Sequence, residues 1–195
     1  IAEQRGRPIF DLAASFHNAE DGPAHQTAGH NAPAPEDLPD EQTVTADFLK
    51  DEDISENFRA ALLRRKPVEM RPVTRRHPLH PEKAEPIRQV WLRAAGEAGD
   101  DPLIHQALLA YVSDHSLMGT ALLPHGITFL DRDMQVASLD HALWFHRPVR
   151  LDDWLFYDME SPIAAGARGF NRGQVFNRQG ELVASVCQEG LMRKA

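Results

Sequence analysis

The sequence predicts an α+β domain in which one antiparallel β-sheet wraps around a single long helix. Residues 101–114 form an apolar helical pattern, two strand-like segments precede it, and four follow. The strand segments mostly alternate apolar and polar residues, so each offers one face to a core. Such a sheet has too many apolar inward positions to leave that face bare, and the helix is the element available to cover it.

The predicted helix has a clear start. Asp101 is a good N-cap, and Pro102 suits the first helical position, which needs no N–H donor. Apolar residues then cover most of the circumference: Leu103, Ile104, Ala107, Leu108, Leu109, Ala110, Tyr111 and Val112. We therefore expect an enclosed helix. If the helix reaches Asp114, a carboxylate sits on the buried stripe and needs a partner. Alternatively, Asp114 or Ser113 caps a second short helix over residues 115–123.

Six segments are predicted as strands: residues 68–73, 86–95, 134–148, 154–162, 165–177 and 181–193. A proline- and histidine-bearing loop separates the first two. Residues 177–180 form a compact hairpin connection in which Gly180 is available for a positive φ.

The N-terminal third is predicted to hold little chemistry. Residues 8–16 alternate as a strand after a turn at Arg5 and Gly6, yet no partner strand is evident, and an isolated strand is unstable in water. Residues 18–42 are rich in Pro, Gly, Ala and acidic residues, as in an extended linker. Residues 43–65 can hold one or two short helices.

The composition excludes several classes of function. The chain has 195 residues, 42% hydrophobic and 26% charged, as in an ordinary soluble protein. A formal net charge of -8 argues against a nucleic-acid partner, because phosphate binding relies on clustered Lys and Arg. No apolar run approaches the roughly 20 residues of a membrane span, and no signal-peptide pattern is evident. The single cysteine, Cys187, fits a reducing compartment, so we expect a cytoplasmic protein that does not bind membranes.

Polar side chains interrupt two apolar strand faces. Gln188 shares a face with Leu182, Ala184, Val186, Gly190 and Met192. A buried amide must find partners, so Gln188 is either tied to nearby backbone or directed at a ligand. Ser138 and Asp140 likewise share an apolar side of segment 134–148, although a lone serine there is more often an ordinary strand residue whose hydroxyl is satisfied.

These polar groups can converge where the sheet meets the helix. Asp114 can then act as a general base on water while Ser138 and Gln188 hold and orient that water. Such assistance is typically worth about 10²- to 10⁴-fold in rate. The expected site activates water and uses no protein nucleophile.

Several motifs resemble those of one protein family. They are YVSD at residues 111–114, LPHGI at 123–127, ASLDHALWFHRP at 137–148, ARGF at 167–170 and VASVCQEG at 183–190. Together they resemble the second half of the type II acyl-CoA thioesterases, the double-hotdog family, from about Pro8 to the C-terminus. The resemblance implies a hotdog fold, in which a sheet wraps around a central helix, and hydrolysis of fatty acyl-CoA without a covalent intermediate.

In that family an Asp, a Thr or Ser, and a Gln of the second hotdog hold the attacking water. By motif these are Asp114, Ser138 and Gln188, with no cofactor or metal. Members commonly have threonine where this chain has Ser138, so we expect a looser rotamer with the chemistry retained.

The resemblance also divides the chain. Residues 66–195 are expected to form the C-terminal hotdog thioesterase domain, residues 18–65 a linker and connector, and residues 1–17 the last strand of a first, largely missing hotdog. Because the family's site lies in a groove shared between hotdogs, we expect a homo-oligomer or pairing with a chain that supplies the first hotdog.

Other residues invite alternative interpretations. The ten histidines lack metal-site spacing, so no metal is expected, and His141 is interpreted as a core or supporting histidine. Cys187 faces away from Gln188 and is interpreted as packing. Gly166, Gly169 and Gly173 lie in a strand pattern, where glycine indicates a bulge or a close backbone approach. Arg168 and Arg172 either meet the phosphates of CoA or are solvated at the edge of a strand.

Two further functions remain open on the sequence. A hotdog hydratase acting on enoyl-CoA would need an Asp and a His working together, and adjacent Asp114 and His115 do not give that geometry. A non-catalytic hotdog that binds acyl-CoA or only assembles is the alternative from another class.

Overall fold

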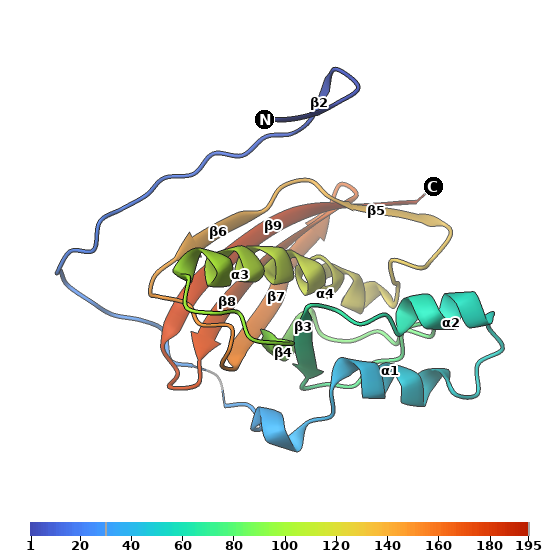
Figure 1. Ribbon diagram of the computed structural model, residues 1–195. Helices are drawn as coiled ribbons and strands as arrows, with labels where there is room; N and C mark the ends of the chain where they lie inside the picture. The colour runs from blue at the N-terminus through green and yellow to red at the C-terminus, as the bar shows by residue number, and fades with distance from the viewer. Residues whose placement is uncertain (30, 195) are drawn as a thin grey trace.

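The computed structural model describes residues 1–29 and 31–194, and its main body is one sheet crossed by one long helix (Figure 1). Residue 30 of the predicted linker and residue 195 of the predicted C-terminal domain lie outside the described residues. The seven-stranded sheet has the order β3-β4-β7-β8-β9-β5, with β6 also paired to β9, and every pair is antiparallel. Its strands are β3 (Val68–Pro72), β4 (Ile87–Ala94), β5 (Met134–Ser138), β6 (Ala142–Phe145), β7 (Leu155–Ala165), β8 (Arg168–Asn177) and β9 (Leu182–Lys194). This architecture confirms the predicted α+β class.

The central helix, α3 (Pro102–Leu117), begins where the sequence predicts. Asp101 Oδ1 accepts a hydrogen bond from Leu103 N at 2.9 Å, and Pro102 is the first helical residue. The helix continues past Asp114, so the alternative in which Asp114 or Ser113 caps a second helix is wrong. The chain then turns through α4 (Gly119–Leu122) and the 3-10 helix η2 (Leu123–His125).

The buried face of α3 differs from the predicted one. It consists of His105, Leu109, Val112, Ser113, Ser116 and Leu117. Leu103 and Tyr111 are instead 63% and 56% exposed, so the expectation of an enclosed helix is wrong. Because the helix is apolar almost all round, hydrophobicity does not determine its rotation. Asp114 lies on the exposed side and not on a buried stripe.

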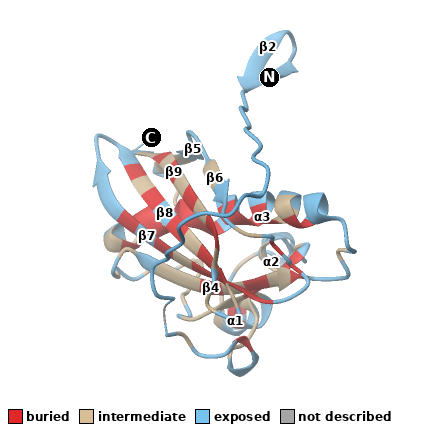
Figure 2. Cartoon of the chain, turned by 90° about the vertical axis from the view of Figure 1, so that its left-hand side faces the viewer, coloured by how far each residue is buried: buried red, intermediate tan, exposed pale blue. Residues whose placement is uncertain are grey.

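The core lies between α3 and the inner face of the sheet. Figure 2 shows buried residues running along β7, β8 and β9. Leu109 and Leu92 are fully buried there, and each such leucine contributes about 1.5–3 kcal/mol relative to an exposed one. On β9 the predicted alternation is confirmed, because Ala184, Val186 and Gln188 are buried while the residues between them are partly exposed.

Two glycines permit close packing at this interface. A Cβ on Gly190 would lie 1.9 Å from Met118 Sδ, and one on Gly173 would lie 2.3 Å from Tyr157 Cε2. The close backbone approach predicted for Gly173 is confirmed, while Gly166 has a φ of 57° in the connection between β7 and β8.

The single strand predicted over residues 134–148 is two strands. Both β5 and β6 pair with β9, and the chain leaves the strand between them. There Asp140 Oδ1 accepts a hydrogen bond from Glu189 N at 2.7 Å. The predicted common face of Ser138 and Asp140 is therefore wrong, because Asp140 bonds the backbone of β9.

The N-terminal region forms a small hairpin followed by an extended segment (Figure 1). β1 (Ala2–Gln4) pairs with β2 (Arg7–Phe10), so the predicted strand ends earlier than residue 16 and does have a partner. Arg5 and Gly6 form the predicted turn, both with positive φ. The chain continues through η1 (Pro35–Asp37), α1 (Glu41–Leu49) and α2 (Glu56–Leu62), which confirms two short helices. No helix among the described residues is long and apolar enough to cross a membrane.

Candidate active site

Three side chains from separate elements meet at one carboxylate oxygen. Asp114 lies in the last turn of α3, Ser138 ends β5, and Gln188 lies on the inner face of β9. Gln188 Nε2 donates to Asp114 Oδ1, and Ser138 Oγ donates to the same oxygen at 3.4 Å. Of the three residues singled out in the sequence, Ser138 and Gln188 therefore both contact Asp114.

The register of the sheet explains this convergence. Ser138 pairs with Gly190 across β5 and β9, and Gln188 is the next inward-facing residue on β9. Gly190 has no side chain, so Met118, just after α3, packs directly against β9 at this point. The end of α3 is thereby held close to the strand that carries Gln188.

Gln188 has one satisfied and one unsatisfied polar atom. The residue is fully buried, and its Oε1 has no hydrogen-bond partner among the described residues. The side chain of Asp114 is 51% exposed, so the carboxylate bridges the buried amide and the surface. A buried acceptor without a donor is unusual in native proteins and suits a group that binds transiently, such as water.

Asn171 is a neighbour that sequence reasoning missed. It pairs with Gln188 in the β8–β9 register, is fully buried, and its Oδ1 also has no partner in the described chain. The signal was the same as for Gln188, because Asn171 is an amide on the inward face of an alternating strand.

His141 lies closer to the carboxylate than the sequence implied. Its Nδ1 is 3.9 Å from Asp114 Oδ1, and its Nε2 is 3.0 Å from Ser113 Oγ. Ser113 Oγ donates its hydrogen to Ala110 O at 3.2 Å. The network therefore assigns the proton of neutral His141 to Nε2 and leaves the Nδ1 lone pair towards Asp114.

Burial lowers the pKa of His141 below its ordinary value, although the nearby charges of Asp114 and Asp140 act to raise it. His141 is thus neutral at pH 7. Neutral His141 can accept a hydrogen bond at Nδ1, but it has no positive charge with which to form an ion pair with Asp114.

Tyr157 supports the last turn of α3 from within the core. Its hydroxyl donates to Ser113 O at 3.0 Å. Burial raises the pKa of Tyr157 well above its ordinary value, so the hydroxyl stays a donor at all physiological pH values. The carbonyl next to Asp114 is consequently held by a rigid buried partner.

Other sequence candidates lie apart from this centre. Burial raises the pKa of the Cys187 thiol, which agrees with a packing role and not with a nucleophile. Arg168 Nη1 pairs with Glu189 at 3.2 Å, and Arg172 Nε pairs with Glu160 at 2.5 Å. Both arginines thus have carboxylate partners on neighbouring strands.

One further cluster has the composition of a metal site. The side chains of Glu52, His77 and His80 offer ligand atoms within 4.8 Å of one another. His77 Nδ1, however, accepts hydrogen bonds from the backbone N–H groups of Leu79 and His80, so the remaining nitrogen carries the proton and faces Glu52. This tautomer suits a hydrogen bond to the carboxylate and not a metal ligand.

The centre combines the carboxylate of Asp114, the hydrogen-bond donors Ser138 Oγ and Gln188 Nε2, and the buried acceptor Gln188 Oε1. A carboxylate within hydrogen-bond reach of a bound water can take its proton, and the amide and hydroxyl restrict where that water sits.

Comparison with known proteins shows which family this chain resembles. A family model described as acyl-CoA thioesterase matches residues 59–191. The chain is 37% identical over 198 residues to acyl-coenzyme A thioesterase 8 of Homo sapiens, an alignment that covers 98% of this chain and 61% of that protein. It is 38% identical over 194 residues to acyl-CoA thioesterase 2 of Haemophilus influenzae, covering 98% of this chain and 66% of that protein. The chain thus spans less than two thirds of these curated relatives.

Comparison with solved structures gives matches of the same kind. The crystal structure of the acyl-CoA thioesterase II TesB2 from Mycobacterium marinum matches with a TM-score of 0.67 and 40% identity, over 91% of this chain and 60% of that chain. A hot dog fold protein from Alicyclobacillus acidocaldarius matches with a TM-score of 0.62 at 14% identity, over 91% of this chain and 59% of that one, which bears on the fold alone. The sheet wrapped around α3 is therefore a hotdog fold.

Proposed function

The chain belongs to the acyl-CoA thioesterase family, and from this premise we propose that it hydrolyses fatty acyl-CoA to the free fatty acid and CoA. The observation that carries the proposal is the convergence of Gln188 and Ser138 on one oxygen of Asp114. This arrangement suits activation of a water molecule in a reaction that needs no nucleophile from the protein.

In the proposed reaction, water attacks the carbonyl carbon of the thioester while Asp114 takes the proton that the water loses. Ser138 and Gln188 orient the water, and the buried, unpaired Oε1 of Gln188 would gain a donor if the water enters beside it. The C–S bond then breaks, and the CoA thiolate receives the proton held by Asp114. The carboxylate returns to its starting charge, and no covalent intermediate forms.

The setting of this domain is also a proposal. Residues 66–195 would be the C-terminal hotdog of a larger arrangement, with residues 18–65 as connector and residues 1–17 as the last strand of a first hotdog. The alignments cover 61% and 66% of the curated relatives, so those relatives are longer than this chain, as a larger arrangement requires. We further propose a homo-oligomer, or pairing with a chain that supplies the first hotdog, and a cytoplasmic location consistent with one free cysteine.

The test is release of free thiol from a long-chain acyl-CoA. It compares this chain, a version joined to a preceding hotdog domain, and Asp114→Asn in both. Asp133→Asn, an exposed aspartate outside the site, is the matched control. We expect turnover to fall at least about 10²-fold in Asp114→Asn and to stay unchanged in Asp133→Asn.

Two outcomes would redirect the proposal. Binding of acyl-CoA without thiol release above the Asp114→Asn level would favour a non-catalytic binding module. Hydration of an enoyl-CoA would favour a hydratase, for which Asp114 and His141 would supply the paired Asp and His.

A further inference from the structure

A second site candidate lies near the end of α3, on another side of that helix from Asp114. A cavity of about 520 Å³ is enclosed by α1, the loop of residues 74–82, the end of α3 and residues 127–130. Its volume falls within the range of small-molecule sites, about 300–1,000 Å³. Ser116 lines it and lies two residues after Asp114 on α3, so these two residues are about 3 Å apart along the helix axis and point to different sides of the helix.

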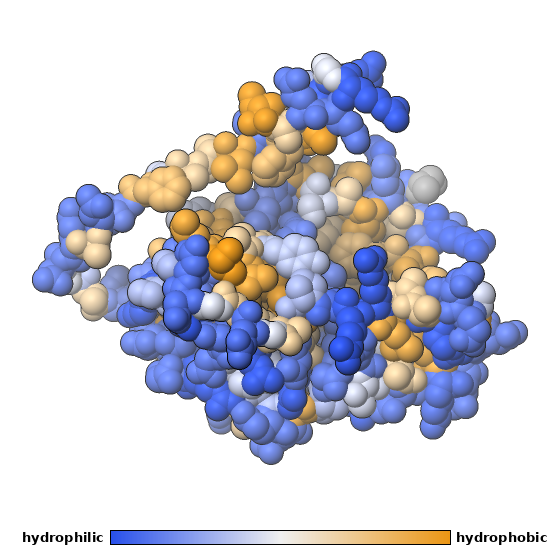
Figure 3. Space-filling model, viewed as in Figure 1, coloured by the Kyte–Doolittle hydropathy of each residue, from blue (hydrophilic) through white to orange (hydrophobic). Residues whose placement is uncertain are grey.

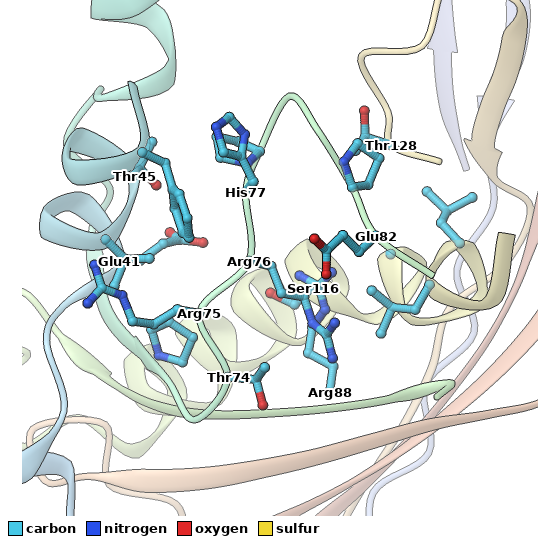
Figure 4. A pocket seen from close by; sticks show the side chains of 18 of the residues that line it. Glu41, Thr45, Thr74, Arg75, Arg76, His77, Glu82, Arg88, Ser116 and Thr128 are labelled. Atoms are coloured by element: carbon cyan, nitrogen blue, oxygen red, sulfur yellow. The ribbon is translucent and has the colours of Figure 1, made fainter. Parts of the chain in front are cut away.

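Arg76 and Arg88 are two of the residues that line this cavity. Figure 4 shows Arg76 and Arg88 close to Ser116 in its lower part. Arg88 Nε is buried and has no hydrogen-bond partner among the described residues. Burial, and then the neighbouring charge of Arg76, lower the pKa of Arg88, and burial lowers the pKa of Arg76. A deeply buried cation with a second, partly buried cation near it is costly unless an anion joins them.

The other basic groups at the cavity already have counter-charges. Arg75 Nη2 pairs with Asp47 at 2.7 Å, and His77 and His80 both face Glu52.

The acidic groups at the cavity offset the charge of the arginine pair only in part. The charge of Glu41 raises the pKa of Arg88, but the Glu41 carboxylate is already bound to Lys66 Nζ at 2.5 Å. Glu82 also lines the cavity, is exposed, and forms no ion pair with Arg76 or Arg88 within the described chain.

We propose that this cavity binds a phosphate group through Arg88 and Arg76. Guanidinium groups match the oxygens of phosphate in charge and geometry, and such charge-assisted hydrogen bonds are among the strongest in proteins. The cavity is much larger than a free ion, so the phosphate belongs to a larger molecule. Its source is either the CoA part of the substrate, which rests on the proposed function, or a separate phosphorylated molecule.

The first experiment measures phosphate binding directly and needs no activity. Inorganic phosphate is titrated into the intact chain by calorimetry, and into Arg88→Gln, Arg76→Gln and the exposed control Arg64→Gln. We expect each of the first two substitutions to weaken binding about tenfold or more, and the control to bind as the wild type does. Arg76→Gln keeps the test valid if the more deeply placed Arg88→Gln fails to fold.

The second experiment identifies the source of the phosphate. The KM and kcat of each variant are compared for an acyl-CoA and for the same acyl group on pantetheine, which lacks phosphate. If CoA is the source, Arg76→Gln raises the KM for acyl-CoA about tenfold, leaves kcat unchanged, and has no effect with acyl-pantetheine. If a separate molecule is the source, phosphate binds but neither KM changes.

The proposal is overturned if phosphate does not bind the wild-type chain, or if it binds both arginine variants as well as it binds the control. Phosphate binding without thioester hydrolysis, both in this chain and in the version joined to a preceding hotdog domain, would contradict the proposed function and leave this site standing.

Discussion

At the scale of single residues, the most informative position is Asp114, because its place in the helix is unfavourable for the fold. A carboxylate in the last turn of α3 lies at the negative end of the helix dipole, which costs about 0.3–1 kcal/mol. Asparagine keeps an oxygen that can accept from Gln188 and Ser138 but cannot take a proton at neutral pH.

We therefore predict that Asp114→Asn raises the free energy of unfolding by about 0.3–1 kcal/mol while it lowers turnover at least about 10²-fold. Urea denaturation and thiol release measure the two effects on the same sample. A loss of stability above about 1 kcal/mol would mean that the carboxylate holds the structure together and that its link to catalysis is indirect.

His141 gives a prediction about pH. Burial lowers its pKa in the folded protein relative to the unfolded chain, where histidine titrates near about 6.5. The unfolded state therefore binds more protons in this window, so stability is fully present above about pH 6.5 and declines as the pH falls below it.

His115 has a pKa lowered by burial as well, so it contributes to the same slope. In His141→Asn the free energy of unfolding should consequently change less between about pH 7 and pH 5 than in the wild type, without becoming flat. Urea denaturation at several pH values provides the measurement, and an unchanged slope would contradict the assignment of a neutral His141.

The sequence predicts those residues of the candidate site that are polar side chains on an otherwise apolar strand face. Gln188 stood out because an amide interrupts an apolar strand face, and it is fully buried as that position implies. Asn171 carried the same signal and was missed. The proximity of His141 to Asp114 could not be predicted, because His141 lies in the break between β5 and β6, where Asp140 bonds Glu189 N.

At the scale of elements, the succession of helix and strands along the chain and the start of α3 followed from the sequence, but the end and the rotation of α3 did not. Its start is set by local chemistry at Asp101 and Pro102. Its buried face includes His105, which accepts a hydrogen bond from Leu151 N at 3.1 Å. A hydrogen bond from a residue far away in the sequence to a buried polar side chain favours this rotation of the helix over one with a few more apolar contacts. The spacing of apolar residues along the helix does not reveal such a bond.

The contact between β8 and the core predicts a sensitive glycine. A Cβ on Gly173 would lie 2.3 Å from Tyr157 Cε2, and Tyr157 is rigid, fully buried and bonded to Ser113 O. Gly173→Ala should therefore displace the ring, destabilise the fold by about 1–3 kcal/mol and lower turnover by moving the end of α3.

Thermal unfolding and thiol release test this prediction. Gly96→Ala is the matched control, because nothing lies within 4 Å of a Cβ at that position. If both substitutions have the same small effect, the packing of Tyr157 against Gly173 is looser than the structure indicates.

At the scale of the whole molecule, the dominant feature is apolar surface left exposed next to the candidate site. Figure 3 shows apolar side chains gathered over the first half of α3. Leu103, Ile104 and Tyr111 of α3 are exposed, and so are Leu139 and Trp144 near the ends of β5 and β6. Contiguous apolar surface of this kind marks an interface in folded proteins.

We predict that the chain self-associates through this face of α3. Leu103→Glu places a charge at a position that is 63% exposed, so it should leave the folded domain intact and shift the protein towards monomer. Sedimentation velocity over a range of concentrations measures the shift. Leu12→Glu is the matched control, because Leu12 is 65% exposed but lies on the extended N-terminal segment. Dissociation by Leu12→Glu alone would place the interface on that segment, and a monomeric wild-type chain would contradict assembly through either surface.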